Sequence, residues 1–172
     1  IDLFTGFNEG NQQHRINGLR WGLDGWCWLA NGDSGGRVRS LATGRELDLG
    51  TRDLRVRPET GELEPVAGMS QFGRARDDWG HWFGCNNSEP CFLLGPDDPA
   101  LTRNRFVSPP PTRHRLVDPG QRLYPTSPTV ARFNYPGSAN HFTSACGLEI
   151  CRDPLLGVDF ASSLVVCEPV HN

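Results

Sequence analysis

The chain has 172 residues, with 20 acidic side chains and 17 basic ones, all of them arginine, and a formal net charge of -3. This balance excludes a basic field for nucleic acid or for an anionic membrane surface, and no apolar run approaches the roughly 20 residues of a membrane span. The 20 glycines and 14 prolines make turns frequent and long helices improbable. We therefore predict an all-β fold in a single domain, residues 1–172.

Short apolar runs between Gly, Pro, Asn and Asp clusters are the predicted strands. In chain order they cover residues 16–22, 25–31, 36–41, 53–58, 79–85, 90–95, 143–151 and 162–169. The segment from 43 to 66 is predicted to form strands joined by tight turns, with Thr-Gly pairs at 43–44 and 60–61 marking two reversals.

A weak internal repeat becomes visible when the runs are aligned by their glycines. Segments that begin at Gly18, Gly80 and Gly147 each read as strand, polar turn, second strand and acidic residue. Such repetition is typical of radial or solenoid β architectures, in which a propeller blade is a four-stranded sheet. Three units do not close a ring of 4 to 8 blades. We predict about three blades of a propeller, in a chain that is a fragment or is completed by remaining blades or other subunits.

Residues 99–140 are predicted to form a long inserted surface loop within the domain. The segment is too rich in proline for regular sheet.

Six cysteines form an even set, and two pairs are close in sequence, Cys85 with Cys91 and Cys146 with Cys151. Neither pair has the C-x-x-C spacing of zinc ribbons or thioredoxin-like sites. Small disulfide loops in an oxidising compartment are one interpretation, with Cys27 and Cys167 as a third pair. Buried free thiols are the alternative.

His14 and Asp33 flank a predicted two-strand hairpin that is rich in tryptophan. An up-strand, a turn and a down-strand would return the carboxylate to the imidazole, where it fixes the ring tautomer and supports a general base. A histidine and an aspartate at this spacing are more often a turn residue and a capping residue, so the spacing alone is weak evidence for chemistry.

The pattern from His14 through Leu19, Gly22 and Asp24 to Gly32-Asp33 resembles the first motif of the soluble glucose and sorbosone dehydrogenases that depend on pyrroloquinoline quinone (PQQ). The resemblance implies a six-bladed β-propeller that oxidises a sugar or an alcohol. His14 would take the hydroxyl proton while hydride passes to the quinone, and Asp33 would orient His14.

A second segment resembles that family's quinone motif less closely. In "RDDWG", Arg76 and Gly80 agree with the motif while Asp77 and Trp79 depart from it. The resemblance implies cofactor binding at Arg76 and Asp77. It also implies Ca²⁺ held by backbone carbonyls of Gly95 and Pro96.

Longer stretches, among them "GNQQHRINGLRWGLDGW", "QFGRARDDWGHWFGCNNS" and "CEPVHN", resemble the propeller of large secreted bacterial proteins known as membrane-bound dehydrogenases. The likeness implies a secreted or periplasmic location in a bacterium, with a cytochrome c as a possible electron acceptor.

Two further interpretations stay open. A non-catalytic propeller could serve as a binding or assembly module of a larger extracytoplasmic complex, with tryptophans as core or as a sugar-stacking platform. Acidic pairs at 77–78 and 97–98 could ligate Ca²⁺ or be solvated turns.

Overall fold

The computed structural model describes residues 1–95, 104, 106, 108, 111–118, 121–123 and 141–170. Within these residues the chain is all-β, with thirteen strands in four antiparallel sheets and only short 3-10 turns as helical elements. We name the sheets A to D. No helix of the described part is long and apolar enough to cross a membrane.

Sheet A has the order β1-β4-β5 and sheet B the order β2-β3-β6-β7; sheet C has the order β11-β10-β9-β8, and sheet D pairs β12 with β13. The strand bounds are β1 Phe4–Phe7, β2 Asn17–Trp21, β3 Cys27–Ala30, β4 Gly36–Ser40, β5 Glu46–Asp48, β6 Asp53–Arg57, β7 Glu62–Val66, β8 Arg74–Arg76, β9 Trp82–Asn86, β10 Glu89–Leu94, β11 Arg113–Arg115, β12 Cys146–Ile150 and β13 Leu164–Cys167.

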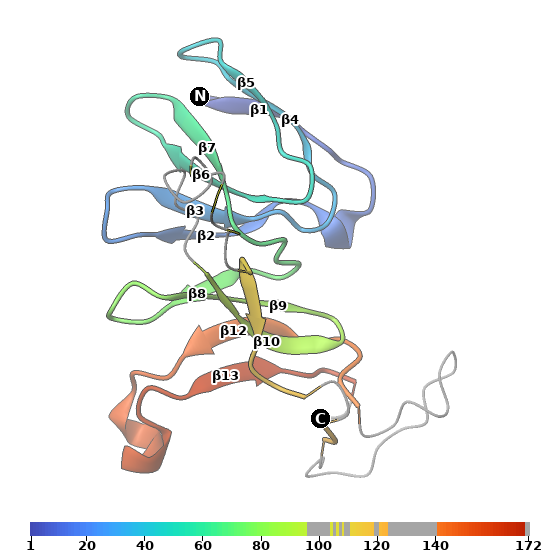
Figure 1. Cartoon of the computed structure of the whole chain (residues 1–172), viewed down its shortest axis with the longest axis vertical. Coiled ribbons are helices and arrows are strands. Elements are labelled where there is room, and N and C mark those ends of the chain that lie inside the picture. Colours follow the sequence, from blue (N-terminus) through green and yellow to red (C-terminus); the bar gives the residue numbers. More distant parts are fainter. Residues whose placement is uncertain are drawn as a thin grey trace.

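The four sheets follow one another as layers along the long axis of the molecule, in the order A, B, C, D (Figure 1). Each interface has its own apolar cluster. Leu29, Leu54 and Leu63 of sheet B pack with Val38 of sheet A, and Trp28 of sheet B packs against Trp82 of sheet C. Ala75 and Cys85 of sheet C pack with Leu148 and Ile150 of sheet D. The core is thus distributed between layers, as expected of stacked sheets that each present one apolar face.

The first strands of sheets B, C and D share one local feature. Gly18, Gly73 and Gly147 lie at or just before the start of β2, β8 and β12, all with positive φ (64°, 82° and 64°). A Cβ added at Gly18 would lie 2.4 Å from the Cα of Gly73, so the two strand starts approach too closely for any other residue. Asn17 ties them together, since Gly73 donates its backbone N–H to Oδ1 of Asn17 at 2.7 Å.

The segment that begins at Gly80 forms a strand, a turn and a second strand, β9 and β10, as predicted, but β9 is the second strand of sheet C, whereas β2 and β12 are the first strands of their sheets. Gly80, rather than lying at a strand start, lies in the turn between β8 and β9, and Gly73 takes the place equivalent to Gly18 and Gly147. The misalignment has a simple cause, because β8 is the three-residue strand Arg-Ala-Arg and has no apolar run to mark it.

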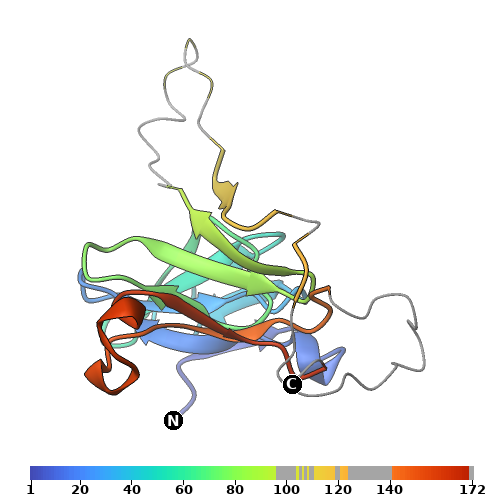
Figure 2. The same cartoon turned by 90° about the horizontal axis from the view of Figure 1, so that it is seen from below.

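One strand falls within the segment predicted to be an irregular insertion. Residues Arg113–Arg115 form β11, which pairs with β10 through Leu93 opposite His114. In Figure 2 the short yellow strand lies beside the green strand β10. The prediction of no sheet between 99 and 140 is therefore wrong at this point, because backbone pairing with β10 compensates for a short polar sequence. The other described positions in that range are not in strands.

Candidate functional site

His14 and Asp33 meet at one end of sheet B. His14 ends the 3-10 turn Gln12–His14 just before β2, and Asp33 follows β3, which runs antiparallel to β2. The distance from His14 Nδ1 to Asp33 Oδ2 is 3.8 Å, with side-chain exposures of 32% and 25%. The separation exceeds a hydrogen bond but lies within effective Coulomb range. The structure therefore brings the two predicted residues together.

A glycine makes this approach possible. Gly32 has a φ of 72°, and a Cβ there would lie 2.0 Å from the carbonyl oxygen of Arg15 and 2.7 Å from that of His14. Asp33 itself has a φ of 69°, a left-handed conformation that Asp tolerates better than most residues. The Gly-Asp pair thus holds a carboxylate against the imidazole at the cost of backbone strain, which is a frequent feature of functional sites.

Gln71 is a third member of the cluster, which sequence reasoning missed. Its Nε2 lies 3.2 Å from His14 Nε2, and its side-chain Oε1 accepts the backbone N–H of Asn87 at 3.1 Å. Because Oε1 is already an acceptor, the amide donates to His14, and His14 Nε2 must carry a lone pair. The ring proton is therefore on Nδ1, facing Asp33.

The environment of Asp33 is mixed. Partial burial raises the pKa of Asp33, while electrostatic interaction with His14 and Arg113 lowers it, and the net direction is upward. Arg113 reaches this region from β11, where it is also bonded to Glu89 and stacks over Phe92 with its guanidinium carbon 4.0 Å from the ring centre.

A cavity of about 850 Å³ lies at the same end of the sheets, although neither His14 nor Asp33 is among its lining residues. Gln13 and Arg15, the neighbours of His14 in sequence, line it together with the glycine starts of β2, β8 and β12, and Ser144 and Asn87 add polar atoms. A volume of this size accommodates a small molecule.

The other predicted cofactor residues lie elsewhere. The starts of β2 and β8 are adjacent, so residues that follow β8 lie at the far end of the sheets from His14. Arg76 ends β8, Asp77 follows it, and Gly95 follows β10 at the same far end. Arg76 and Gly95 line a second cavity, of about 480 Å³. Arg76, Asp77 and Gly95 thus form a group that is separated from His14 by the length of β8.

The far end has its own histidine–carboxylate pair. His81 Nδ1 lies 2.7 Å from Oδ2 of Asp77. The backbone N–H groups of His81 and Trp79 also donate to Asp77 Oδ1. Burial raises the pKa of Asp77, but these hydrogen bonds outweigh it and the net shift is downward. Asp77 is thus committed to the β8–β9 turn.

The calcium site at the backbone carbonyls of Gly95 and Pro96 stays a prediction. Of the acidic pairs, Asp78 pairs with Arg152 at 3.0 Å, and the described residues hold no group of three metal-ligating side chains. Pro96, Asp97 and Asp98 lie outside the described residues. With Gly95 at the opposite end from His14, a calcium ion there would not polarise a group bound at His14.

All six cysteines are free thiols. Cys85 and Cys91 lie in one core cluster on the hairpin of β9 and β10. The predicted pairings of Cys146 with Cys151 and of Cys27 with Cys167 are also wrong, because each pair is too far apart for a disulfide. Cys146 and Cys151 are five residues apart along extended chain, about 16 Å. Cys27 belongs to sheet B and Cys167 to sheet D, on opposite sides of sheet C.

A family model described as "Domain of unknown function (DUF7133)" matches residues 1–172, and the chain belongs to this family. No curated protein and no solved structure matches the chain.

Proposed function

We propose that this member of the DUF7133 family is part of a propeller-type dehydrogenase whose general base is His14, acting on a hydroxyl group of a sugar or an alcohol. The observation that carries the proposal is the pair of contacts of His14, with the Gln71 amide nitrogen 3.2 Å from Nε2 and the Asp33 carboxylate 3.8 Å from Nδ1, from which we assign the ring proton to Nδ1. A base in this state accepts a proton at Nε2 while the carboxylate stabilises the resulting imidazolium.

Gln71 defines where the substrate hydroxyl sits. Its amide N–H occupies the lone pair of His14 Nε2 in the resting protein. A substrate hydroxyl that donates to His14 takes that place. Because Gln71 Oε1 is fixed by Asn87, the displaced amide remains close enough to bind the substrate's oxygen.

The architecture we propose is three successive blades, formed by sheets B, C and D. Two observations support it: the first strands of these sheets start side by side at equivalent glycines, and sheet C is a simple meander from β8 to β11. Sheet A is an addition to this pattern, since β4 and β5 are inserted between β3 and β6.

The residues that the resemblance assigns to the quinone and the calcium ion, Arg76, Asp77 and Gly95, lie at the other end of the sheets from His14. We therefore derive no step through them. The proposal concerns the proton-accepting site, for which the hydride acceptor is a separate question.

Dye-linked oxidation of a panel of aldoses and primary alcohols, measured both with and without added PQQ and Ca²⁺, tests the proposal. We expect His14→Ala to lower turnover by about 10²–10⁴-fold and Asp33→Asn to lower it less. His81→Ala is the matched control, because His81 also contacts a carboxylate but at the far end. No turnover by the parent protein, or equal losses in both histidine variants, would contradict the proposal.

A second readout does not depend on turnover. Long-range ¹⁵N NMR of the histidine rings should show His14 protonated on Nδ1 and bare on Nε2. The opposite tautomer would remove the structural basis of the proposal.

The second cavity favours another function, that of a binding module. Trp28 and Trp82 stack there with ring centres 4.8 Å apart, and Asp24, His81 and His114 add polar groups. Trp82 is buried, so the half-buried ring of Trp28 is the aromatic surface that a carbohydrate would contact beside these hydrogen-bonding groups. Titration of tryptophan fluorescence with mono- and disaccharides tests this function. A spectrum that does not change in the parent protein counts against it, and so does a change that survives Trp28→Ala.

A further inference from the structure

Two cysteines face each other across sheet D. In the antiparallel pairing of β12 with β13, Cys146 is the direct partner of Cys167. Directly opposed residues in antiparallel strands have Cα atoms about 4.5–5.5 Å apart, which falls inside the range of about 4.4–6.8 Å that a disulfide spans. Both side chains are accessible to some degree, since Cys146 is half-buried and Cys167 is exposed.

The position of this pair within the hairpin is informative. Residues 151–163 connect β12 to β13 at one end, while Cys146 and Cys167 lie at the open end. Glu168, next to Cys167, already clamps that end by accepting the backbone N–H groups of Thr143 and Ser144, each at 2.9 Å. The open end of the hairpin is thus held by a carboxylate and flanked by two thiols.

Among the four sheets, sheet D has the fewest strands in the described residues, and a covalent clamp would stabilise it the most. It has two strands among the described residues, against four in sheets B and C. Two-stranded ribbons are marginally stable, and their ends fray first. A covalent link at the open end would hold both strands in register against sheet C.

From the register and the position of the pair, we propose that Cys146 and Cys167 are a site of reversible disulfide formation that staples the open end of sheet D. The reaction uses a small disulfide such as oxidised glutathione. The Cys167 thiolate attacks one sulfur of glutathione disulfide and releases a glutathione thiolate. The Cys146 thiolate then attacks the Cys167 sulfur of the mixed disulfide and releases the second. Two thiols lose two protons to solvent and two electrons to the oxidant.

The order of attack follows from exposure. Cys167 is exposed and meets the oxidant first. Burial, together with Cys167 and Glu168, raises the pKa of the Cys146 thiol, so Cys146 is the slower nucleophile and acts as the resolving cysteine.

The alternatives nearby are less suited. Cys85 and Cys91 are both buried, and burial raises the pKa of Cys85 to about 11 and that of Cys91 to about 12. Thiols with such values are rarely ionised at neutral pH and react slowly with external oxidants.

Peptide mapping tests the proposal on the full chain. The protein is incubated with oxidised glutathione, the remaining thiols are alkylated, and a non-reducing digest is analysed by mass spectrometry. We expect one cross-linked peptide that joins Cys146 to Cys167 and disappears after reduction. A product that joins other cysteines, or one that stops at glutathionylated Cys167, overturns the proposal.

Thermal unfolding supplies a second measurement. A staple that closes a loop of about 20 residues should raise the midpoint by about 5–10 °C on oxidation. Cys167→Ser should abolish this increase. Cys151→Ser, at the connected end of the hairpin, is the control and should keep it. An equal increase in Cys167→Ser would contradict the staple.

Discussion

Three charged residues on one face of β6 lie at three depths. Residues two apart along a strand point to the same side, so Asp53, Arg55 and Arg57 share a face. Their side-chain exposures rise from 0% through 27% to 39%. The strand and its face are the same for all three, while burial differs and Asp53 carries the opposite charge. The comparison therefore sets a buried charged contact beside two partly exposed ones.

Asp53 is the buried end of this series. Its Oδ1 accepts the backbone N–H groups of Asn31 and Ser70, at 2.8 and 3.0 Å, and its Oδ2 lies 3.2 Å from Nη1 of Arg74 in sheet C. Arg74 is itself 2% exposed and lies against the rings of Trp28 and Trp82. The pair thus connects sheets B and C through two groups that are too buried to form hydrogen bonds with water.

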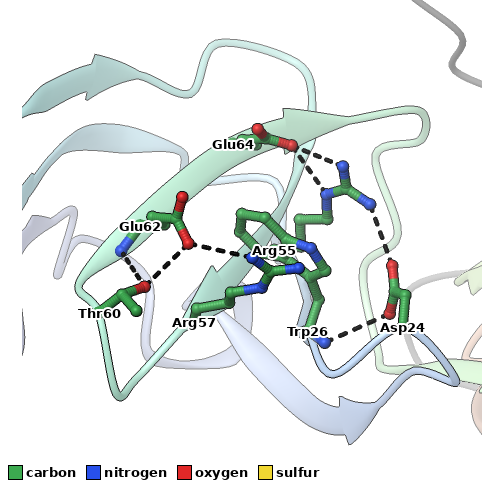
Figure 3. Close-up of polar contacts among 7 residues, drawn as sticks. All are labelled: Asp24, Trp26, Arg55, Arg57, Thr60, Glu62 and Glu64. Carbon is green, nitrogen blue, oxygen red and sulfur yellow. Dashed lines mark hydrogen bonds and ion pairs between the residues drawn. The ribbon is translucent and has the colours of Figure 1, made fainter.

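Arg55 and Arg57 represent the exposed end (Figure 3). Arg55 lies between Glu64, its cross-strand partner, and Asp24, while Arg57 pairs with its own partner Glu62. Both guanidinium carbons are 4.5 Å from the ring centre of Trp26. More contacts are made here than at Asp53, yet each of them competes with solvent. Counting contacts would rank the two ends in the wrong order, because an exposed ion pair has water as an alternative and a buried one does not.

The largest expected effect comes from leaving one buried charge without its partner. Asp53→Asn keeps an acceptor oxygen for Asn31 and Ser70 but removes the charge opposite Arg74. We expect a loss of about 3–5 kcal/mol in the free energy of unfolding and a fall of about 6–20 °C in Tm, measured by denaturant and thermal unfolding.

Arg74→Met and the double variant complete the cycle for this pair. Removing both charges leaves no unpaired ion in the interior, so the double variant should lose clearly less than the sum of the single losses. If the two single losses in unfolding free energy add up to the loss of the double variant, Asp53 and Arg74 are not coupled. Burial would then not explain the difference between Asp53 and the two arginines of β6.

Arg55→Ala should have a smaller effect. It removes two partly exposed ion pairs and the contacts with Trp26 and Trp28, for an expected loss of about 1 kcal/mol. Arg57→Ala, with one ion pair and one ring contact, should lose less. Repeating both measurements in about 1 M salt should reduce these losses and leave that of Asp53→Asn nearly unchanged. If the loss in unfolding free energy for Arg55→Ala does not change with salt, the ion pairs of Arg55 behave as the buried pair of Asp53 and Arg74 does.

The same contrast explains what the sequence could predict. All eight predicted apolar runs overlap strands of the structure, because the apolar residues of such a strand are visible in its own sequence. The strand β8, Arg-Ala-Arg, was missed because its burial depends on Asp53, twenty-one residues earlier, and on rings from two other strands. The burial of a charged residue can be predicted from sequence only when the residue that pairs with it is known.

The candidate site follows the same rule. His14 and Asp33 are joined by one hairpin, so their spacing predicted their proximity. Gln71 lies fifty-seven residues from His14 and reaches it only because the starts of β2 and β8 pack together. Arg76 was placed with His14 by resemblance, although it ends the strand whose start is near His14, and the strand length separates them.

The smallest expected effect is a change in the pKa of Glu62, the exposed partner of Arg57, which can be measured directly. The Thr60 hydroxyl donates to its carboxylate at 2.9 Å and Arg57 at 3.2 Å, and together they lower the pKa of Glu62, with Thr60 the larger cause. Because the folded pKa is below the unfolded one, the stabilisation is present above about pH 4.5 and is lost as the pH falls through the lowered value. NMR titration of the Glu62 carboxyl carbon should show Thr60→Ala raising its pKa more than Arg57→Ala does. The reverse order would mean that the charge of Arg57, rather than the hydrogen bond from Thr60, controls the pKa of this exposed carboxylate.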